Sequence, residues 1–328
     1  MWKKIEVLGN LIPKGRSSSA IASVGTNLYL FGGEYVPRVP VDDLLYCFDT
    51  LTSKWSVIAN SNGTSPIKRL AHTMTAIGKH LYVYGGRREN EEDDLDDLHQ
   101  FNTETNEWRQ LTTTTGNGPQ NRSYHSATNI DKMLFIFGGC QHSTQKHGDL
   151  MFGTKRMNDL HALNVDTLEW KKIDAQNPPS IRGGPTLCSG HNNQLFVHGG
   201  FNGKELGELF VCDLQSLIWK QLIPTDSVIP GPRSVHSLLP LKSGSMLITI
   251  CGEKEPSKKG HLGSGEYWND TFVYDVDANK WTKCIYDTGP SARGWIQATN
   301  VNDNTIILFG GFTGDDRIND IWQFQLQQ

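Results

Sequence analysis

The chain has 328 residues and a formal net charge of −4, with 31 lysines and arginines against 35 aspartates and glutamates. This balance gives no electrostatic footprint for nucleic acid or for an acidic membrane surface. No apolar run approaches the roughly 18 residues of a membrane-spanning helix. The opening segment MWKKIEVLGN also lacks the apolar core of a secretory signal. We therefore expect a cytoplasmic protein with neither a nucleic-acid partner nor a membrane partner.

The cysteines support the same compartment. They form no CxxC pair and most lie inside apolar, strand-like runs, at Cys47, Cys140, Cys188, Cys212, Cys251 and Cys284. Scattered cysteines of this kind are typical of reduced thiols in an intracellular protein.

Short strands dominate the chain from its start. The first is the segment 1–7, which carries Trp2. After Arg16, an alternating apolar run at 28–33 ends in two glycines, and a second run at 42–49 begins with two aspartates. Trp55 then lies in a further short strand. β-branched and aromatic runs separated by turn residues predict strands of an antiparallel sheet.

This order of elements recurs through the whole chain. The glycine-ending runs are LYLFGG, LYVYGG, LFIFGG, LFVHGG, the degenerate LITICG, and IILFGG. Their second glycines lie 52 to 61 residues apart, at Gly33, Gly86, Gly139, Gly200, Gly252 and Gly311. A period of roughly 50 residues is typical of kelch repeats.

Each repeat contains three further markers. An arginine opens the unit, at Arg16, Arg69, Arg122, Arg182, Arg233 and Arg293. An acidic or amide residue precedes the third strand, as in DDLLYCFD and NDLHALN. A tryptophan closes the unit, at Trp55, Trp108, Trp170, Trp219 and Trp281. Four short strands per unit predict an all-β fold, a six-bladed kelch β-propeller formed by a single domain of residues 1–328.

The last repeat has no tryptophan strand of its own, so we expect the N-terminal strand with Trp2 to complete it and close the ring. The double glycines are expected where strands approach closely, and the tryptophans between blades. His72, His125 and His236 recur at one repeat position, which indicates packing and hydrogen bonding rather than catalysis.

The segments that follow the glycine pairs should cross one end of the propeller channel. They span 20 residues in the third repeat and 18 in the fifth, against 8 to 11 in the others. Long loops at one end of a rigid scaffold commonly carry function. The residue directly after each glycine pair should ring this mouth: Glu34, Arg87, Cys140, Phe201, Glu253 and Phe312.

Such a mouth is a candidate pocket for a small ligand, because carboxylates, arginine and aromatic rings meet there at a concave surface. Arg87 and Arg156 could clamp an anionic group through paired N–H donors. Glu34 and Phe312 would contribute to the same ligand site. The alternative is that the arginines pair with the mouth carboxylates or with the acidic run 89–97 and have a structural role.

Several segments match more than the general repeat, namely WKKIE, YLFGGEYVPRVPVDDLLYCFD, YVYGGR, TNEWRQLT, RSYHSA, IRGG, GFNG and PSARGW. From Trp2 to its end the chain resembles the plant specifier proteins of the nitrile-specifier, thiocyanate-forming and epithiospecifier types. These kelch proteins redirect glucosinolate breakdown towards nitriles, epithionitriles or thiocyanates. The resemblance implies a substrate pocket lined by arginines, which Arg87 and more loosely Arg156 match. Trp295, in RGW, matches a tryptophan beside that pocket.

The resemblance also implies a ferrous-iron site in the loop of the fifth repeat, with ligands in a Glu-x₃-Asp-x₃-His motif. Glu253 and His261 match its ends. The middle position is the neutral Ser257, and Glu255 is the nearest substitute carboxylate. Because non-haem iron is usually held by at least three protein ligands, this departure makes Fe(II) an uncertain cofactor of the chain.

Two other clusters have a functional and an ordinary interpretation. Cys140, His142 and His147 carry zinc or copper ligand types, but a polar insertion is favoured because no fourth ligand is evident. The acidic run 89–97 could attract a cation, but it lacks the glycine and ligand spacing of a calcium loop. We expect a solvated loop there.

The sequence therefore supports two candidate functions. The first is a pocket for a small anionic or sulfur-containing ligand, with Fe(II)-assisted lyase or rearrangement chemistry as its enzymatic form. The alternative is a non-catalytic adaptor module that binds a protein on the same face. The sequence leaves open whether the chain is an enzyme, since fold-level likeness is weak evidence for a reaction.

Overall fold

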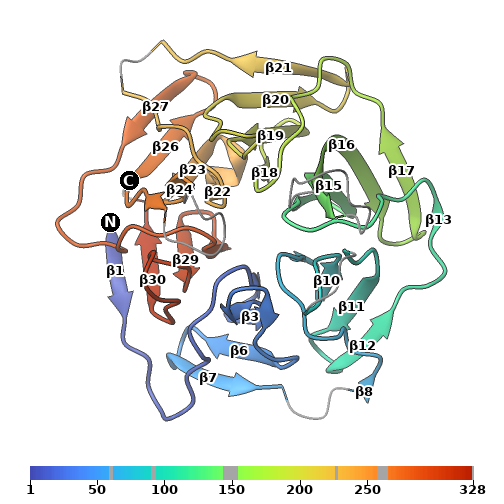
Figure 1. Cartoon of the computed structure of the whole chain (residues 1–328), viewed down its shortest axis with the longest axis vertical. Helices are drawn as coiled ribbons and strands as arrows, with labels where there is room; N and C mark the ends of the chain where they lie inside the picture. Colours follow the sequence, from blue (N-terminus) through green and yellow to red (C-terminus); the bar gives the residue numbers. More distant parts are fainter. Residues whose placement is uncertain (59–61, 90–93, 143–153, 226–227, 257–264, 327–328) are drawn as a thin grey trace, which may run out of the picture.

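The computed structural model describes residues 1–58, 62–89, 94–142, 154–225, 228–256 and 265–326. These residues form six mainly antiparallel sheets arranged around a central channel, as Figure 1 shows. Helical structure in these ranges is limited to one short 3₁₀ turn at Lys242–Gly244. Within them, no helix is long and apolar enough to cross a membrane.

In each of the first three blades the strands follow one another from the channel outwards. Blade one holds β2 (Ala20–Val24), β3 (Asn27–Phe31), β6 (Leu45–Asp49) and β7 (Lys54–Val57). Blade two holds β9 (Thr73–Ile77), β10 (His80–Tyr84), β11 (Leu98–Asn102), β12 (Glu107–Gln110) and β8 (Asn62–Gly63). Blade three holds β14 (Ser126–Ile130), β15 (Met133–His142), β16 (Thr154–Asn164), β17 (Glu169–Ile173) and β13 (Thr115–Gly116).

The other three blades have four strands each. Blade four holds β18 (Thr186–Ser189), β19 (Gln194–His198), β20 (Leu209–Asp213) and β21 (Ile218–Leu222). Blade five holds β22 (Ser237–Leu241), β23 (Met246–Ile250), β26 (Thr271–Asp275) and β27 (Lys280–Lys283). Blade six holds β28 (Gln297–Asn302), β29 (Thr305–Phe309), β30 (Ile321–Gln325) and β1 (Trp2–Ile5).

The predicted ring closure is confirmed. Strand β1 pairs antiparallel with β30, in a register that sets Trp2 opposite Phe324 and Ile5 opposite Ile321. The two chain ends therefore lie close together at one blade, as Figure 1 shows. Blade six takes one strand from the start of the chain and three from its end, which ties the two termini into one sheet.

A closed circle of backbone hydrogen bonds links all six blades. Each member lies two residues after a repeat arginine, and each N–H donates to the carbonyl of its counterpart in the preceding blade at 2.8 to 3.2 Å. The members are Ser18, Ala71, Tyr124, Gly184, Val235 and Trp295. All six have a positive φ between 45° and 59°. The circle fixes the blades around the channel near the end that carries the mouth residues.

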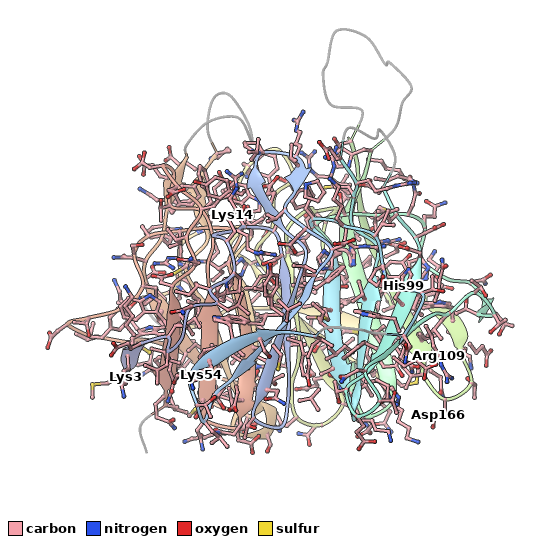
Figure 2. All side chains as sticks on the ribbon, turned by 90° about the horizontal axis from the view of Figure 1, so that it is seen from below. Lys3, Lys14, Lys54, His99, Arg109 and Asp166 are labelled. Carbon is pink, nitrogen blue, oxygen red and sulfur yellow. The ribbon has the colours of Figure 1, made fainter. Side chains whose placement is uncertain are left out.

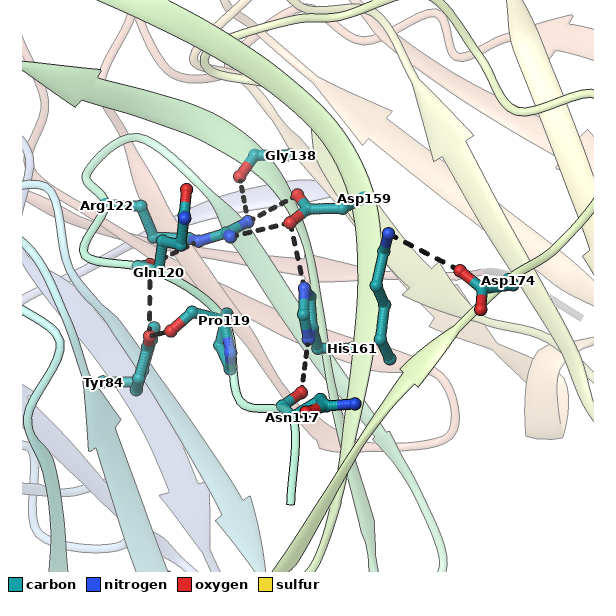
Figure 3. Close-up of polar contacts among 10 residues, drawn as sticks. Tyr84, Asn117, Pro119, Gln120, Arg122, Gly138, Asp159, His161 and Asp174 are labelled. Carbon is teal, nitrogen blue, oxygen red and sulfur yellow. Dashed lines mark hydrogen bonds and ion pairs between the residues drawn. The ribbon is translucent and has the colours of Figure 1, made fainter. Parts of the chain in front are cut away.

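The repeat arginines are the second constant feature of the blades. In blade three, the buried Arg122 guanidinium contacts both oxygens of Asp159, at 2.8 and 2.9 Å, and donates to the carbonyl of Gly138 at 2.9 Å (Figure 3). His161 contacts the same carboxylate at 2.9 Å. Four more pairs repeat this contact, namely Arg16–Asp42, Arg69–Asp97, Arg233–Asp270 and Arg293–Asp320. In blade four the corresponding pair is looser, with Arg182 at 3.7 Å from Glu208. The arginine and the acidic residue of each repeat thus form one structural unit that holds the turn containing the glycine pair.

The tryptophans pack between blades, as expected. Trp108 contacts Phe31 of blade one with 5.9 Å between ring centroids, and Trp55 contacts Phe309 of blade six at 5.4 Å. Trp2 donates a hydrogen bond from its indole to the hydroxyl of Thr271 in blade five at 3.0 Å. Burial of these rings on both faces makes the spaces between blades the main hydrophobic core.

The glycine pairs adopt the expected left-handed backbone. Gly32 and Gly33 have φ values of 62° and 96°, and a Cβ at Gly33 would lie 2.7 Å from the side chain of Ser19. In blade five, Cys251 replaces the first glycine and keeps a φ of 55°. The second position keeps glycine in all six repeats, whereas the first admits a cysteine in blade five.

Three details differ from the sequence-based expectation. Blades two and three have a fifth, short outer strand that pairs in parallel, β8 on β12 and β13 on β17. Strand β15 does not end at its glycine pair but runs through it to His142, with a register shift between Phe137 and Gly139. Two small hairpins also stand outside the blades: β4 (Glu34–Val36) with β5 (Val39–Pro40), and β24 (Glu253–Glu255) with β25 (Glu266–Tyr267).

Candidate functional site

The six residues that follow the glycine pairs occupy equivalent places at one end of the channel. Each forms a β-bridge with the residue after a repeat arginine, as in Ser17 with Glu34 and Ser234 with Glu253. In Figure 2 the β4–β5 hairpin, drawn in blue, projects at the upper end of the molecule, whereas Asp166 lies at the opposite end. We call this end, defined by Glu34, Arg87, Cys140, Phe201, Glu253 and Phe312, the mouth.

Glu34 has its interactions satisfied within the protein. Its carboxylate forms an ion pair with Arg317 at 3.2 Å and accepts the backbone N–H of Arg38 at 2.5 Å. The hydroxyl of Ser17 donates to it at 3.4 Å. This sector of the mouth, between blades one and six, therefore carries a neutral pair.

Arg87 and Arg156 differ from Glu34 in this respect. The Arg87 Nη1 atom lies 3.5 Å from Nε2 of His142, and the Arg156 guanidinium lies over the ring of Phe201 at 5.0 Å. The Nε atoms of both arginines are buried and, in the part of the chain that the structure describes, have no hydrogen-bond partner. Neither guanidinium forms an ion pair with a described carboxylate, so the alternative of a pairing with Glu34 or Glu253 does not occur.

Cys140 marks the place where the two arginines come together. It faces Arg156 across the β15–β16 ladder and bridges to Ser123. Burial raises the pKa of its thiol to about 12, and the charges of Arg156 and Arg87 oppose this rise. The thiol is therefore neutral and does not offset the arginine charges, whereas the nearby charge of Asp94 adds to the rise of its pKa.

The proposed soft-metal cluster is only partly described. His142 is held by Asp94, which accepts its backbone N–H at 2.6 Å and contacts its ring at 3.0 Å. His147 lies outside the described residues. Asp94 is buried and Asp97 pairs with Arg69, so these two members of the acidic run have structural contacts and are not simply solvated.

On the opposite side of the mouth, Glu253 lies near a second carboxylate that sequence reasoning missed. Glu253 is buried, and both oxygens of Glu205 are buried without a hydrogen bond of ordinary geometry among the described residues. Burial, with repulsion from Glu205, raises the pKa of Glu253 to about 8. Burial likewise raises the pKa of Glu205 to about 7, against a smaller opposing effect of the Ser234 hydroxyl. This sector holds two carboxyl groups that, among the described residues, have no positive side chain paired to them.

Three aromatic rings lie beside Glu253. Tyr267, its partner across the β24–β25 hairpin, packs against Trp295 and Phe312 at centroid distances of 6.0 Å each. Trp295 and Phe312 lie 6.1 Å apart. Arg317 covers one face of Phe312 at 4.7 Å. Tyr267 was not predicted because a tyrosine in a short strand looks like any other β residue.

The iron-site residues are only partly described. Ser257 and His261 lie outside the described residues. Glu255 is exposed and faces Glu266 in the hairpin, away from the buried position of Glu253. Among the residues that the structure does describe, no three His, Cys, Asp or Glu side chains are grouped so that they could hold a metal ion.

The channel beneath the mouth contains a cavity of about 200 Å³. Trp295 lines it, as do His72, His125 and His236. The histidines are buried between blades, where His125 contacts Thr73 and His236 contacts Thr186, each at 3.0 Å. Burial lowers the pKa of all three, so they are neutral. These contacts agree with a packing role.

A six-bladed propeller with double-glycine turns, paired arginines and inter-blade tryptophans defines a kelch-repeat protein. The chain belongs to this family, because the model of the KLHDC2/KLHL20/DRC7 Kelch-repeats domain matches residues 15–252.

Individual relatives cover the chain more fully. An N-(sulfonatooxy)prop-2-enimidothioate sulfolyase from Thlaspi arvense is 30% identical over 94% of this chain and 92% of its own length. Kelch domain-containing protein 2 from Bos taurus is 25% identical over 79% of this chain and 67% of its own. An Adagio-like protein 3 from Oryza sativa subsp. japonica is 28% identical over 97% of this chain but 49% of its own length. The similarity to a specifier-type sulfolyase thus extends over nearly the whole propeller.

Proposed function

We propose that the mouth binds a small anionic ligand through Arg87 and Arg156. The observation that carries this proposal is the pair of buried Nε atoms, on neighbouring blades, that have no partner among the described residues. Both side chains are partly buried and have no carboxylate partner among the described residues, and a bound anion would compensate both charges. Planar guanidinium groups favour carboxylate, sulfate and phosphate oxygens through paired N–H donors.

The chemistry of one relative supports a sulfur-containing anion. The name of the Thlaspi arvense protein specifies a sulfonatooxy substrate, which carries a negatively charged sulfate ester. Transferred to this chain, that chemistry would place the sulfate group on Arg87 and Arg156, with Phe201 under the Arg156 side chain. Both arginines lie next to Cys140, which supports a placement in which one sulfate group contacts both of them.

An iron-assisted lyase or rearrangement is the enzymatic form of this proposal. Bound iron would act as a Lewis acid on the sulfur or the leaving group. The described residues supply Glu253 with Glu205 beside it, fewer than the three ligands that such iron usually requires. We therefore derive no reaction step through iron, and the proposal is restricted to ligand binding.

A protein-binding role on the same face is the second candidate. One observation favours it: Tyr35 and Val36, on the β4–β5 hairpin at the mouth, are 36% and 54% exposed. Exposed aromatic and aliphatic rim residues are typical anchors of a protein partner. In that case Tyr35→Ala would reduce binding of the partner, whereas Arg87→Ala would be tolerated.

The ligand proposal is tested by titrating the protein calorimetrically with methyl sulfate at low ionic strength. We expect Arg87→Ala and Arg156→Ala each to weaken binding about tenfold or more, since a charge-assisted contact is lost. Arg109→Ala is the matched control, because Arg109 is exposed and lies away from the mouth (Figure 2). Thermal midpoints should stay close to that of the unmodified protein. Equal affinity in all four proteins would refute the proposal.

A further inference from the structure

The charged groups of the mouth are divided into sectors. Arg87 and Arg156 form a positive sector on blades two and three, and Glu205 and Glu253 form a negative one on blades four and five. Phe201 lies between them, because its ring lies under Arg156 at 5.0 Å and its backbone bridges to Glu205. A compact ligand can therefore reach both sectors.

The negative sector has features of a binding site rather than of a structural pair. Glu253 is 7% exposed, and both oxygens of Glu205 are buried without a hydrogen-bond partner among the described residues. The other carboxylate of the mouth, Glu34, has Arg317 as its counter-ion. Because buried carboxylates are normally paired, a couple that has no partner among the described residues is suited to receive a positive group from a ligand.

The surroundings specify the kind of cation. Beside Glu253, the Tyr267 ring packs edge to face against Trp295 and Phe312, whose rings are tilted against each other. Gly294 permits this arrangement, since a Cβ there would lie 3.1 Å from the Tyr267 ring and 3.4 Å from the backbone nitrogen of Glu253. Aromatic rings with nearby carboxylates attract organic ammonium groups through cation–π contacts. A divalent metal ion prefers a full shell of oxygen ligands, which two carboxylates among rings do not provide.

We infer that Glu205, Glu253 and the rings of Tyr267, Trp295 and Phe312 form a subsite for an organic ammonium group. Because this inference builds on the proposed anion site, the ligand is a small zwitterion. Its anionic group contacts Arg87 and Arg156, and its ammonium group lies against the rings and the two carboxylates. Arg317 over Phe312 at 4.7 Å shows that this aromatic cluster already accepts one cation.

Two probes of equal shape separate the contribution of the ammonium group to binding from that of the anionic group. Choline O-sulfate carries a trimethylammonium group and a sulfate ester, and 3,3-dimethylbutyl sulfate has carbon in place of the nitrogen. We expect the protein to bind choline O-sulfate about tenfold more tightly than the neutral-ended probe. Glu205→Gln and Glu253→Gln should each abolish most of that preference, while Glu6→Gln, at an exposed position, should preserve it. Arg87→Ala should weaken the binding of both probes by a similar factor.

The outcomes distinguish this inference from the proposed function. Equal binding of both probes, still weakened by Arg87→Ala, would overturn the ammonium subsite and leave the anion site standing. Binding of tetramethylammonium that depends on Glu253, without binding of either sulfate, would support the subsite and overturn the anion site. Failure of all three probes to bind would overturn both.

Discussion

The backbone N–H of Ser18 donates to the carbonyl oxygen of Trp295 at 3.2 Å and joins the first blade to the last. This contact completes the circle of hydrogen bonds that surrounds the channel. Ser18 contacts Glu34 through its hydroxyl, and Trp295 packs against Phe312, so the same link lies directly beneath the mouth. Closure of the ring and shape of the candidate site are therefore coupled.

Loss of the N-terminal tryptophan should weaken the whole propeller. Trp2 is 5% exposed, packs against Phe324 at 5.2 Å and bonds to Thr271 of the neighbouring blade. We expect Trp2→Ala to lower the free energy of unfolding by about 3–5 kcal/mol, measured by chemical denaturation. Lys3→Ala, at the exposed neighbouring position labelled in Figure 2, should have little effect. Comparable losses of unfolding free energy in both variants would contradict a role for β1 in closing the ring.

The arginine–carboxylate pairs should behave as buried ion pairs. Arg122→Met leaves Asp159 without its main partner and should cost about 3 kcal/mol or more in denaturant unfolding. The double variant with Asp159→Leu should lose less free energy of unfolding than the single variant, because no uncompensated charge remains. Arg109→Met, whose arginine side chain is 65% exposed, should change stability by less than about 0.5 kcal/mol. An Arg122→Met variant as stable as the Arg109→Met control would disprove the structural role.

The carboxylate couple at the mouth should make stability depend on pH. The pKa values of Glu205 and Glu253 in the folded protein are about 7 and about 8, both above the ordinary value of 4.5. The folded state thus retains protons that the unfolded chain releases, so stability is full below about pH 4.5 and is lost as pH rises to about 8.

Glu253→Gln should flatten that dependence. We expect its thermal midpoint to exceed that of the unmodified protein by a few degrees at pH 8.5, since about 1–2 kcal/mol of repulsion and desolvation is removed. At pH 4.5 the two midpoints should coincide. Glu6→Gln serves as the exposed control. A Glu253→Gln midpoint at or below that of the unmodified protein at pH 8.5 would show that the charged carboxylate is stabilised by a partner.

Ferrous iron should bind weakly. The described residues provide one carboxylate, that of Glu205, beside Glu253, and the position between Glu253 and His261 is the neutral Ser257. We expect an anaerobic calorimetric titration with Fe(II) to give no saturation at micromolar concentration. Micromolar binding that Glu253→Ala and His261→Ala both abolish would assign the negative sector to a metal ion and not to an ammonium group.

The sequence predicts most of the architecture because the same pattern of residues recurs in six repeats, so that each element is predicted six times. The glycine pairs, the arginines and the tryptophans fix the blades, and Trp2 specifies how the ring closes. The residues after the glycine pairs were placed correctly at one mouth because their position follows from the strand that precedes them.

The pairing of side chains within the mouth could not be predicted in the same way. Glu205 bridges to Phe201 in blade four and acts on Glu253 in blade five, and no local sequence pattern encodes a contact between two blades. Glu34 was predicted as a ligand residue, but Arg317, from a loop nearly 300 residues away, supplies its counter-ion. Contacts across the ring depend on the closed fold.

The most direct test of the account is a crystal structure of the protein soaked in selenate, located by the anomalous signal of selenium. The account predicts a selenate bound at the mouth within hydrogen-bonding distance of the guanidinium groups of both Arg87 and Arg156. That peak should disappear in Arg87→Ala crystals. An empty mouth, with selenate bound only at exposed lysines, would contradict the claim that the mouth is an anion-binding site.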